Sequence, residues 1–128
     1  MRIGKVDCYT LDIPFDAGAR QDRFLGPNAW NKLTTLLVRV ETETGLVGWG
    51  DAFAYSCADA VRAAVETMVA PAIIGMDATD IAGINRHCQQ SLHLFGRYGI
   101  TMFAISGVDI ALWDIAAKRA RMPLYQLL

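Results

Sequence analysis

The sequence predicts an α+β domain in which a three-stranded antiparallel meander is followed by a helical bundle. Apolar residues recur with the two-residue period of strands up to about residue 52. From about residue 56 onward they recur at the three- and four-residue spacings of helices. The 128 residues are enough for one domain with a core, but they are too few for an eight-stranded α/β barrel, which needs roughly 250 residues.

Three segments have the pattern of strands: residues 6–13, 33–42 and 46–50. The first ends at Pro14, which has no backbone N–H to donate to a sheet. In the second, Val38 and Val40 alternate with polar neighbours, as in a strand with one buried face. Gly45 can adopt the positive φ of a tight turn, so the second and third strands are expected to form a hairpin.

Two loops are candidates for binding a ligand. The long connection from Phe15 to Asn31 is too aromatic for a linker, and the short segment from Ala52 to Tyr55 follows the third strand. Both loops leave the same end of the predicted meander. Their aromatic side chains either cover a ligand or pack on the domain's own core. The candidate substrate-binding residues are Phe15, Arg20, Arg23, Phe24, Trp30, Phe53 and Tyr55.

These candidates favour two different kinds of ligand. Arg20 and Arg23 offer forked donors for a carboxylate or for hydroxyl groups, as an acid sugar would require. The alternative is that both are solvated loop charges. The aromatic residues would instead form a lid over an apolar substrate.

Three helices are predicted: from Ser56 to about Pro71, from the region 77–80 to about Phe95, and from about Thr101 to Ala120. Ser56 and Asp59 have the spacing of a capping box at the start of the first helix. An apolar stripe on the second helix consists of Ile81, Ile84, Cys88, Leu92 and Phe95. The core stripe of the third helix consists of Ile105, Val108, Leu112 and Ile115. Asp114 and Lys118 form an i,i+4 ion pair of favourable polarity on the third helix.

Composition excludes several classes of function. Twelve Lys and Arg residues against thirteen Asp and Glu give a net charge of −1, which does not favour binding to nucleic acid or to an anionic membrane. No stretch has the 18 or so uncharged apolar residues of a membrane helix, and the N-terminus lacks the apolar run of a signal peptide. Three cysteines without a CxxC pair indicate reduced thiols. We therefore expect a soluble, cytoplasmic protein.

The sequence contains no complete catalytic constellation. His87 and His93 are six residues apart on one helix and point to different faces. Asp109 and Asp114 also diverge, and they fit surface or interface charges better than a paired acid and base. Ser106 lacks the preceding glycine of a nucleophile elbow. We expect no catalytic residue and no metal ligand in this segment.

Three segments, in this order and spacing, resemble the mandelate racemase and muconate lactonizing enzyme group of the enolase superfamily. Residues 45–52, GLVGWGDA, are similar to its G-x-x-G-W-G-E signature, except that Asp51 replaces the usual Glu. Residues 104–118, AISGVDIALWDIAAK, resemble its A-x-S-x-[VI]-D-x-A-L-W-D-x-x-x-K helix. Residues 122–128, MPLYQLL, resemble the P-[VL]-[YW]-x-L-L segment that leads to the first barrel strand.

The resemblance implies that residues 1–128 are an N-terminal capping domain and that 121–128 begin the link to a barrel beyond Leu128. In the family the barrel supplies the acid and base residues and the carboxylates that hold Mg²⁺, and the reaction abstracts the proton α to a substrate carboxylate. The capping domain supplies loops that set substrate choice, which here correspond to 15–30 and 52–55. The implied partners are a small carboxylate substrate, the protein's own barrel and further copies of the same chain.

The implied activity is that of an acid-sugar dehydratase or of a racemase or epimerase, with a muconate-type cycloisomerase as an alternative. A standalone interaction module without activity is the alternative of a different class. The low charged fraction, 20%, predicts an apolar docking face on the domain. The candidates for that face are the small-residue strip Ala104, Gly107 and Ala111 and the C-terminal run Leu124, Tyr125, Leu127 and Leu128.

Overall fold

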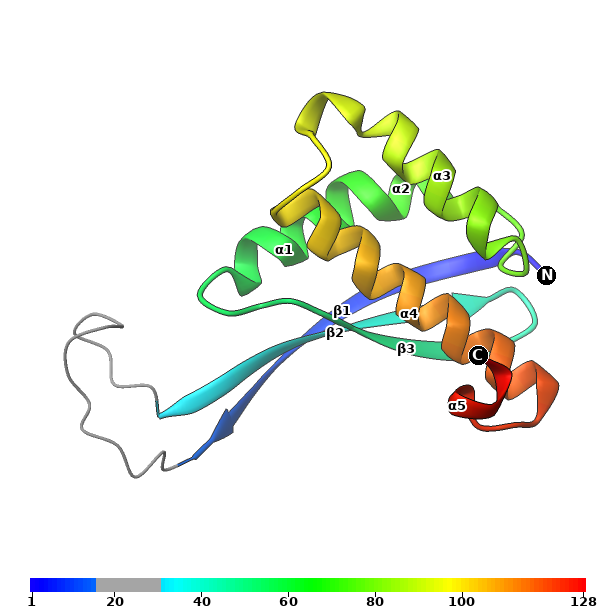
Figure 1. The fold of residues 1–128 in the computed structure, drawn as a ribbon, viewed down its shortest axis with the longest axis horizontal. Coiled ribbons are helices and arrows are strands. Elements are labelled where there is room, and N and C mark those ends of the chain that lie inside the picture. Colours follow the sequence, from blue (N-terminus) through cyan, green and yellow to red (C-terminus); the bar gives the residue numbers. More distant parts are fainter. Residues whose placement is uncertain (16–30) are drawn as a thin grey trace.

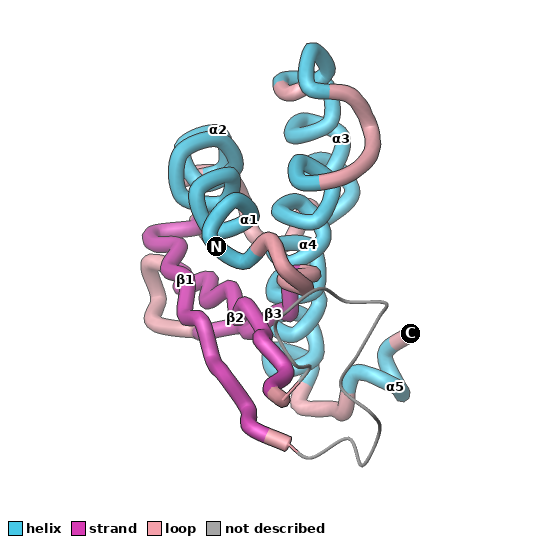
Figure 2. The backbone as a smooth tube through the Cα atoms, turned by 90° about the vertical axis from the view of Figure 1, so that its left-hand side faces the viewer, coloured by secondary structure: helices cyan, strands magenta, loops and turns pink. Residues whose placement is uncertain are grey.

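The computed structural model describes residues 1–15 and 31–128. One antiparallel sheet has the strand order β1-β2-β3. Its strands are β1 (Ile3–Pro14), β2 (Lys32–Thr42) and β3 (Val47–Ala52). The helical elements that follow are α1 (Ala58–Ala64), the π-helical η1 (Val65–Val69), α2 (Ala70–Ile73), α3 (Ile81–Ser91), the 3-10 turn η2 (His93–Phe95), α4 (Ile100–Ala120) and α5 (Leu124–Leu127). Helices α1–α4 cover one face of the sheet (Figures 1 and 2), which confirms the predicted meander followed by helices.

The β2–β3 hairpin closes at the predicted glycine. Gly45 has a φ of +82°, and the N–H of Thr42 donates to the carbonyl of Leu46 at 2.9 Å. Val38 and Val40 are fully buried on the helix-covered face. The strand alternation in the sequence therefore reports correctly which face of β2 is buried.

Helix α4 crosses the sheet and forms the centre of the core. Its predicted stripe is confirmed, because Ile105, Val108, Leu112 and Ile115 are each 3% exposed or less. In the predicted second helix, the apolar stripe fails at one position: Phe95 is 59% exposed. This helix is α3 in the structure. The helix ends at Ser91, and the following 3-10 turn rotates Phe95 away from the core.

A close backbone contact joins β3 to α4. A Cβ built on Gly50 would lie 1.9 Å from the carbonyl oxygen of Gly107, and one on Gly48 would lie 2.1 Å from that of Ala111. Ala104 and Ala111 are fully buried by this packing. The prediction that Ala104, Gly107 and Ala111 form an exposed docking face is therefore wrong, since the sheet of the same domain covers them.

The elements α1, η1 and α2 follow one another without a break and form one helix with a π-helical segment in its middle. This helix was predicted to end near Pro71, but α2 continues to Ile73. Pro71 lies in the first turn of α2, directly after the widened π-helical turn η1. The backbone N–H that proline lacks is tolerated at this position.

Both outer strands have partners for their edges. On β3, the N–H of Trp49 donates to Asp114 Oδ2 at 2.8 Å, and Lys118 Nζ donates to the carbonyl of Val47 at 3.0 Å. Lys118 also pairs with Asp114 at 2.6 Å, as predicted. Since an unpaired strand edge promotes association, this pair of helix residues protects the edge of β3 as well as supporting α4.

The start of β1 is covered by the turn that precedes α3. Ile3 N–H donates to the carbonyl of Met76 at 2.9 Å, and Ile3 accepts from Gly75 N–H at 2.8 Å. The N-terminal ammonium of Met1 lies 3.1 Å from Asp77 Oδ1. These bonds join the first residues of the chain to the helical layer.

Among the described residues, α4 alone is long and apolar enough to cross a membrane by length and composition. Half of that stretch is buried within the domain. Helix α4 packs against β3 as a core helix, and this packing explains its apolar composition.

We predict that Gly50→Ala destabilises the domain strongly. The added Cβ meets the backbone of α4, which cannot move aside as a flexible side chain would, so we expect a loss of about 3 kcal/mol or more in the free energy of unfolding. Urea unfolding of the purified chain measures it. Gly4→Ala is the matched control, because its nearest neighbour would lie at an ordinary 3.4 Å. Equal stability of the two variants would contradict the prediction.

The second prediction concerns pH. The backbone N–H of Thr79 and the Met1 ammonium lower the pKa of Asp77 from 3.8 to about 2. A carboxyl with a lowered folded-state pKa stabilises the fold above its unfolded pKa, and that contribution disappears as the pH falls through the folded value. Between about pH 4 and pH 2 the wild-type melting temperature should therefore fall more steeply than that of Asp77→Asn. Parallel melting curves for the two proteins would refute this role of Asp77.

Candidate functional site

The two predicted ligand loops leave the sheet at the same end (Figure 1). Phe15 N–H donates to the carbonyl of Asn31 at 2.9 Å, at the far end of the β1–β2 pair. β3 stops earlier, where Ala52 pairs with Leu36. The β1–β2 pair therefore extends about four residues, or roughly 13 Å, beyond the end of β3.

The loop after β3 is a tight turn with a buried centre. Ala54 is 5% exposed, and its carbonyl accepts from the N–H of Cys57 at 3.1 Å. Ser56 has a φ of +55°, a left-handed backbone conformation that costs free energy for residues other than glycine. The predicted capping box is wrong: Cys57 is the N-cap residue of α1, and no side chain caps this end of the helix. The left-handed turn at Ser56 has replaced that arrangement.

The predicted loop aromatics divide between packing and exposure. The ring of Phe53 lies 4.6 Å from that of Phe103 on α4, centroid to centroid, yet Phe53 remains 51% exposed. Tyr55 is 41% exposed, and Phe15 is partly buried at the end of β1. Phe53 therefore packs on its own domain, as one interpretation expects, and still presents apolar surface. The interpretation that these aromatics cover a ligand stays a prediction. The other predicted site residues, Arg20, Arg23, Phe24 and Trp30, lie outside the described residues.

A hollow of about 380 Å³ lies between β2 and the loop after β3. It is lined by Thr34, Ala54, Ser56, Cys57, Ala58, Asp59 and Ala60. Thr34 also donates from Oγ1 to Asp12 Oδ1 at 2.7 Å, and Lys32 Nζ lies 2.7 Å from Asp12 Oδ2. The hydrogen bonds from Lys32 and Thr34 lower the pKa of Asp12. No sequence pattern predicts this polar cluster, because it depends on the register of β1 against β2.

The candidate carboxylates and histidines of the helices have structural partners. Asp114 accepts from Trp49 and Lys118, and Asp109 accepts from Asn85 Nδ2 at 3.0 Å. His93 Nδ1 lies 2.8 Å from the carbonyl of Gln90. Within residues 1–15 and 31–128, no three His, Cys, Asp or Glu side chains gather closely enough to hold a metal ion. The described residues therefore do not fit a Mg²⁺ site.

The cysteines fit the predicted reduced thiols. All three are free, and Cys8 and Cys88 are buried. Burial raises the pKa of each of these two thiols to about 11, so neither is a nucleophile at neutral pH. Their role is packing in the core.

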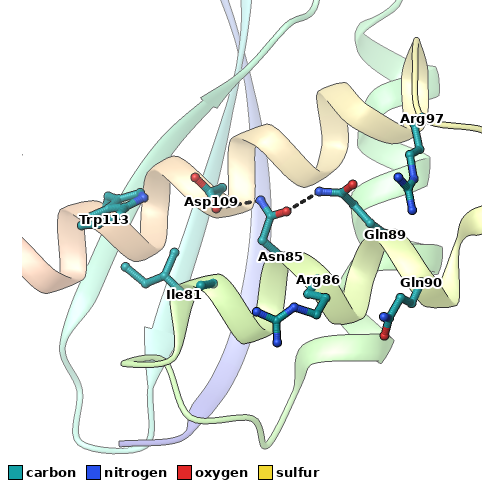
Figure 3. A pocket seen from close by; sticks show the side chains of 9 residues that line it. Ile81, Asn85, Arg86, Gln89, Gln90, Arg97, Asp109 and Trp113 are labelled. Atoms are coloured by element: carbon teal, nitrogen blue, oxygen red, sulfur yellow. Dashed lines mark hydrogen bonds between the residues drawn. The ribbon is translucent and has the colours of Figure 1, made fainter.

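A second, larger hollow of about 520 Å³ lies between α3 and α4 (Figure 3). A row of hydrogen-bonded side chains runs through it, in which Gln89 donates to Asn85 and Asn85 donates to Asp109. Arg86 lies on α3, and Arg97 lies at one end of the hollow, in the segment before α4 (Figure 3). Of the predicted loop residues that the structure describes, Phe15, Phe53 and Tyr55, none lines this groove.

Comparison with known proteins agrees with this architecture. The sequence pattern of the family described as "Mandelate racemase / muconate lactonizing enzyme, N-terminal domain" matches residues 26–128. The chain superposes on a member of the enolase superfamily from Agrobacterium tumefaciens with a TM-score of 0.85 and 28% identity, covering 98% of this chain and 37% of that one. A superfamily member from Polaromonas sp. JS666 gives a TM-score of 0.82 at 34% identity, covering 99% and 33%.

Curated relatives include two acid-sugar dehydratases. An arabinonate dehydratase from Saccharolobus solfataricus is 38% identical over 100 residues, which cover 78% of this chain and 27% of the relative. A D-mannonate dehydratase from Novosphingobium aromaticivorans is 44% identical over 91 residues, which cover 71% and 22%. The chain thus spans about a quarter of the length of the curated relatives it matches.

We predict that Ser56→Gly stabilises the domain slightly, by about 0.5 kcal/mol, because glycine relieves the left-handed backbone at this position. Thermal or urea unfolding of the purified chain measures it. The control is Ser106→Gly, at an exposed position inside α4, where glycine should lower stability by about 0.5 kcal/mol. The same sign of change in both variants would show that residue 56 is not strained.

Proposed function

Because the chain belongs to the mandelate racemase and muconate lactonizing enzyme N-terminal domain family, we propose that it is the capping domain of an acid-sugar dehydratase. The observation that carries this proposal is the pairing of a capping-domain fold with relatives named for dehydration of arabinonate, mannonate and galactonate. The activity itself belongs to the longer enzyme, since this chain matches only about a quarter of those relatives.

The alternatives have weaker support. Racemisation or epimerisation starts from the same α-proton abstraction, and it remains the second candidate. A structural neighbour named 3,6-anhydro-D-galactonate cycloisomerase is 21% identical and therefore supports the fold alone. A standalone interaction module finds no support in the relatives.

In this proposal the domain covers the substrate and selects it. Phe53 and Tyr55 present partly exposed aromatic surface at the end of β3, where a lid would exclude water. Arg20 and Arg23 would bind the distal hydroxyl or carboxylate groups of an acid sugar through forked hydrogen bonds. We place proton abstraction and Mg²⁺ in the barrel, and we assign no step to a metal in this chain, because its described residues do not fit one.

The proposed barrel would dock on the face formed by the outer side of α4 and by α5. Tyr125 is 78% exposed and Leu128 77%, and Ile110 on α4 is 40% exposed. Apolar side chains of this size are normally covered when they cluster. This proposed face keeps the C-terminal run of the predicted docking face, Leu124, Tyr125, Leu127 and Leu128. It includes Ile110 in place of Ala104, Gly107 and Ala111, which are buried.

The experiment is a turnover screen of the full-length enzyme with Mg²⁺ against a panel of aldonic and aldaric acids. Dehydration removes the α-proton and the β-hydroxyl group, and the resulting enol becomes a 2-keto-3-deoxy acid that can be detected by its carbonyl. We expect such a product from at least one acid sugar. Inversion of configuration at the α-carbon without loss of water would favour a racemase or epimerase. If the enzyme neither dehydrates nor inverts any of these acids, the proposal is refuted.

Arginine variants test the substrate contact in the same enzyme. We expect Arg20→Ala and Arg23→Ala to lower kcat/KM about tenfold or more, because each removes a charge-assisted hydrogen bond. Arg86→Ala is the matched control, since Arg86 lies on α3 in the groove between α3 and α4. Unchanged kcat/KM in both loop variants would remove these arginines from the site.

A further inference from the structure

Phe103, in the first turn of α4, contacts the loop that follows β3. The rings of Phe53 and Phe103 are tilted by 46°, with their centroids 4.6 Å apart. Phe103 is partly buried and packs against the core, whereas Phe53 is 51% exposed. One ring of the pair is thus anchored in the domain, and the other is carried by the loop.

The anchor is rigid because α4 has little freedom to move. Thr101 and Ala104, on either side of Phe103, are 7% and 0% exposed. The N–H of Phe103 donates to the carbonyl of Gly99 at 3.0 Å, in the first hydrogen-bonded turn of the helix. About one turn further on, the backbone of α4 at Gly107 lies directly against Gly50. The position of Phe103 is therefore set by the core packing.

On the loop side, Phe53 is placed to control its neighbours. It follows the last residue of β3, its carbonyl lies 3.9 Å from Cys57 Sγ, and Tyr55 is two residues further along. The buried Ala54 fixes the middle of the turn. A shift of the Phe53 ring would change the direction in which the backbone enters the turn, and with it the position of Tyr55.

We propose that Phe103 is a positioning residue for the loop 52–55 and that it acts through Phe53 to set the enzyme's selectivity among acid sugars. This inference rests on the proposed function of that loop. Phe103 does not touch substrate. It holds the first aromatic residue of the loop in place, so that the lid closes over the substrate in one geometry.

The test is a double-mutant cycle in the full-length enzyme, with Phe103→Ala, Phe53→Ala and the double variant. We expect Phe103→Ala to raise KM for the preferred acid sugar about three- to tenfold, with a smaller change in kcat. The ratio of kcat/KM for the preferred acid sugar to kcat/KM for a second acid sugar should decrease. In the Phe53→Ala background the same substitution should have no further effect. Additive effects, or unchanged KM and selectivity in Phe103→Ala, would overturn the proposal.

Two further variants separate positioning from general stability. Phe103→Leu keeps apolar volume and should recover most of the wild-type KM. If Phe103→Ala does not fold, Phe103→Leu takes its place in the double-mutant cycle. Its effect on KM should then be smaller than that expected for Phe103→Ala, and it should not add to the effect of Phe53→Ala. Phe95→Ala is the matched control, because Phe95 is an exposed phenylalanine in the turn before α4. An equal KM change in Phe95→Ala would overturn the proposal.

Hydrogen–deuterium exchange distinguishes failure of this inference from failure of the proposed function. In the full-length protein, Phe103→Ala and Phe53→Ala should each raise amide exchange in residues 53–57 without raising it in β2. This measurement requires no turnover. If the wild-type enzyme dehydrates no acid sugar, the proposed function fails, while unchanged exchange in residues 53–57 rejects the positioning role independently.

Discussion

The backbone contact between β3 and α4 is the constraint on which the rest of the domain depends. Gly48 and Gly50 leave space for the carbonyls of Ala111 and Gly107, so that the backbones of β3 and α4 approach each other directly at these two positions. At that separation Asp114 reaches the N–H of Trp49 across the edge of β3. Any side chain at Gly50 would push the layers apart, and the edge bonds would be lost together with the packing.

The same contact positions the exposed loop. A Cβ on Gly107 would lie 2.7 Å from that of Ala52, the last residue of β3. The next residue, Phe53, lies against Phe103 one turn earlier on the same helix. A loop that selects ligands on a rigid scaffold needs such an anchor, since loops by themselves are mobile. The core of this domain therefore determines where the loop 52–55 begins.

Several carboxylates of the domain connect its structural elements. Asp114 binds the edge of β3, Asp109 receives a hydrogen bond from α3, and Asp77 holds the N-terminus. Asp12 joins β1 to β2 through Lys32 and Thr34. Each of these carboxylates thus accepts hydrogen bonds or pairs with a charge within the domain itself.

The sequence by itself determined the strands, the helices and the core stripe of α4, because burial imposes periods of two and of three to four residues that are visible along the chain. It also determined the turn at Gly45, whose positive φ is a local property. Only the tertiary structure decided that Ala104, Gly107 and Ala111 face the sheet, that Ser56 turns left-handed instead of capping a helix, and that Phe53 meets Phe103. Small residues show that a close approach is possible but not which element approaches, and contacts between residues 50 positions apart follow from packing, which no local pattern records.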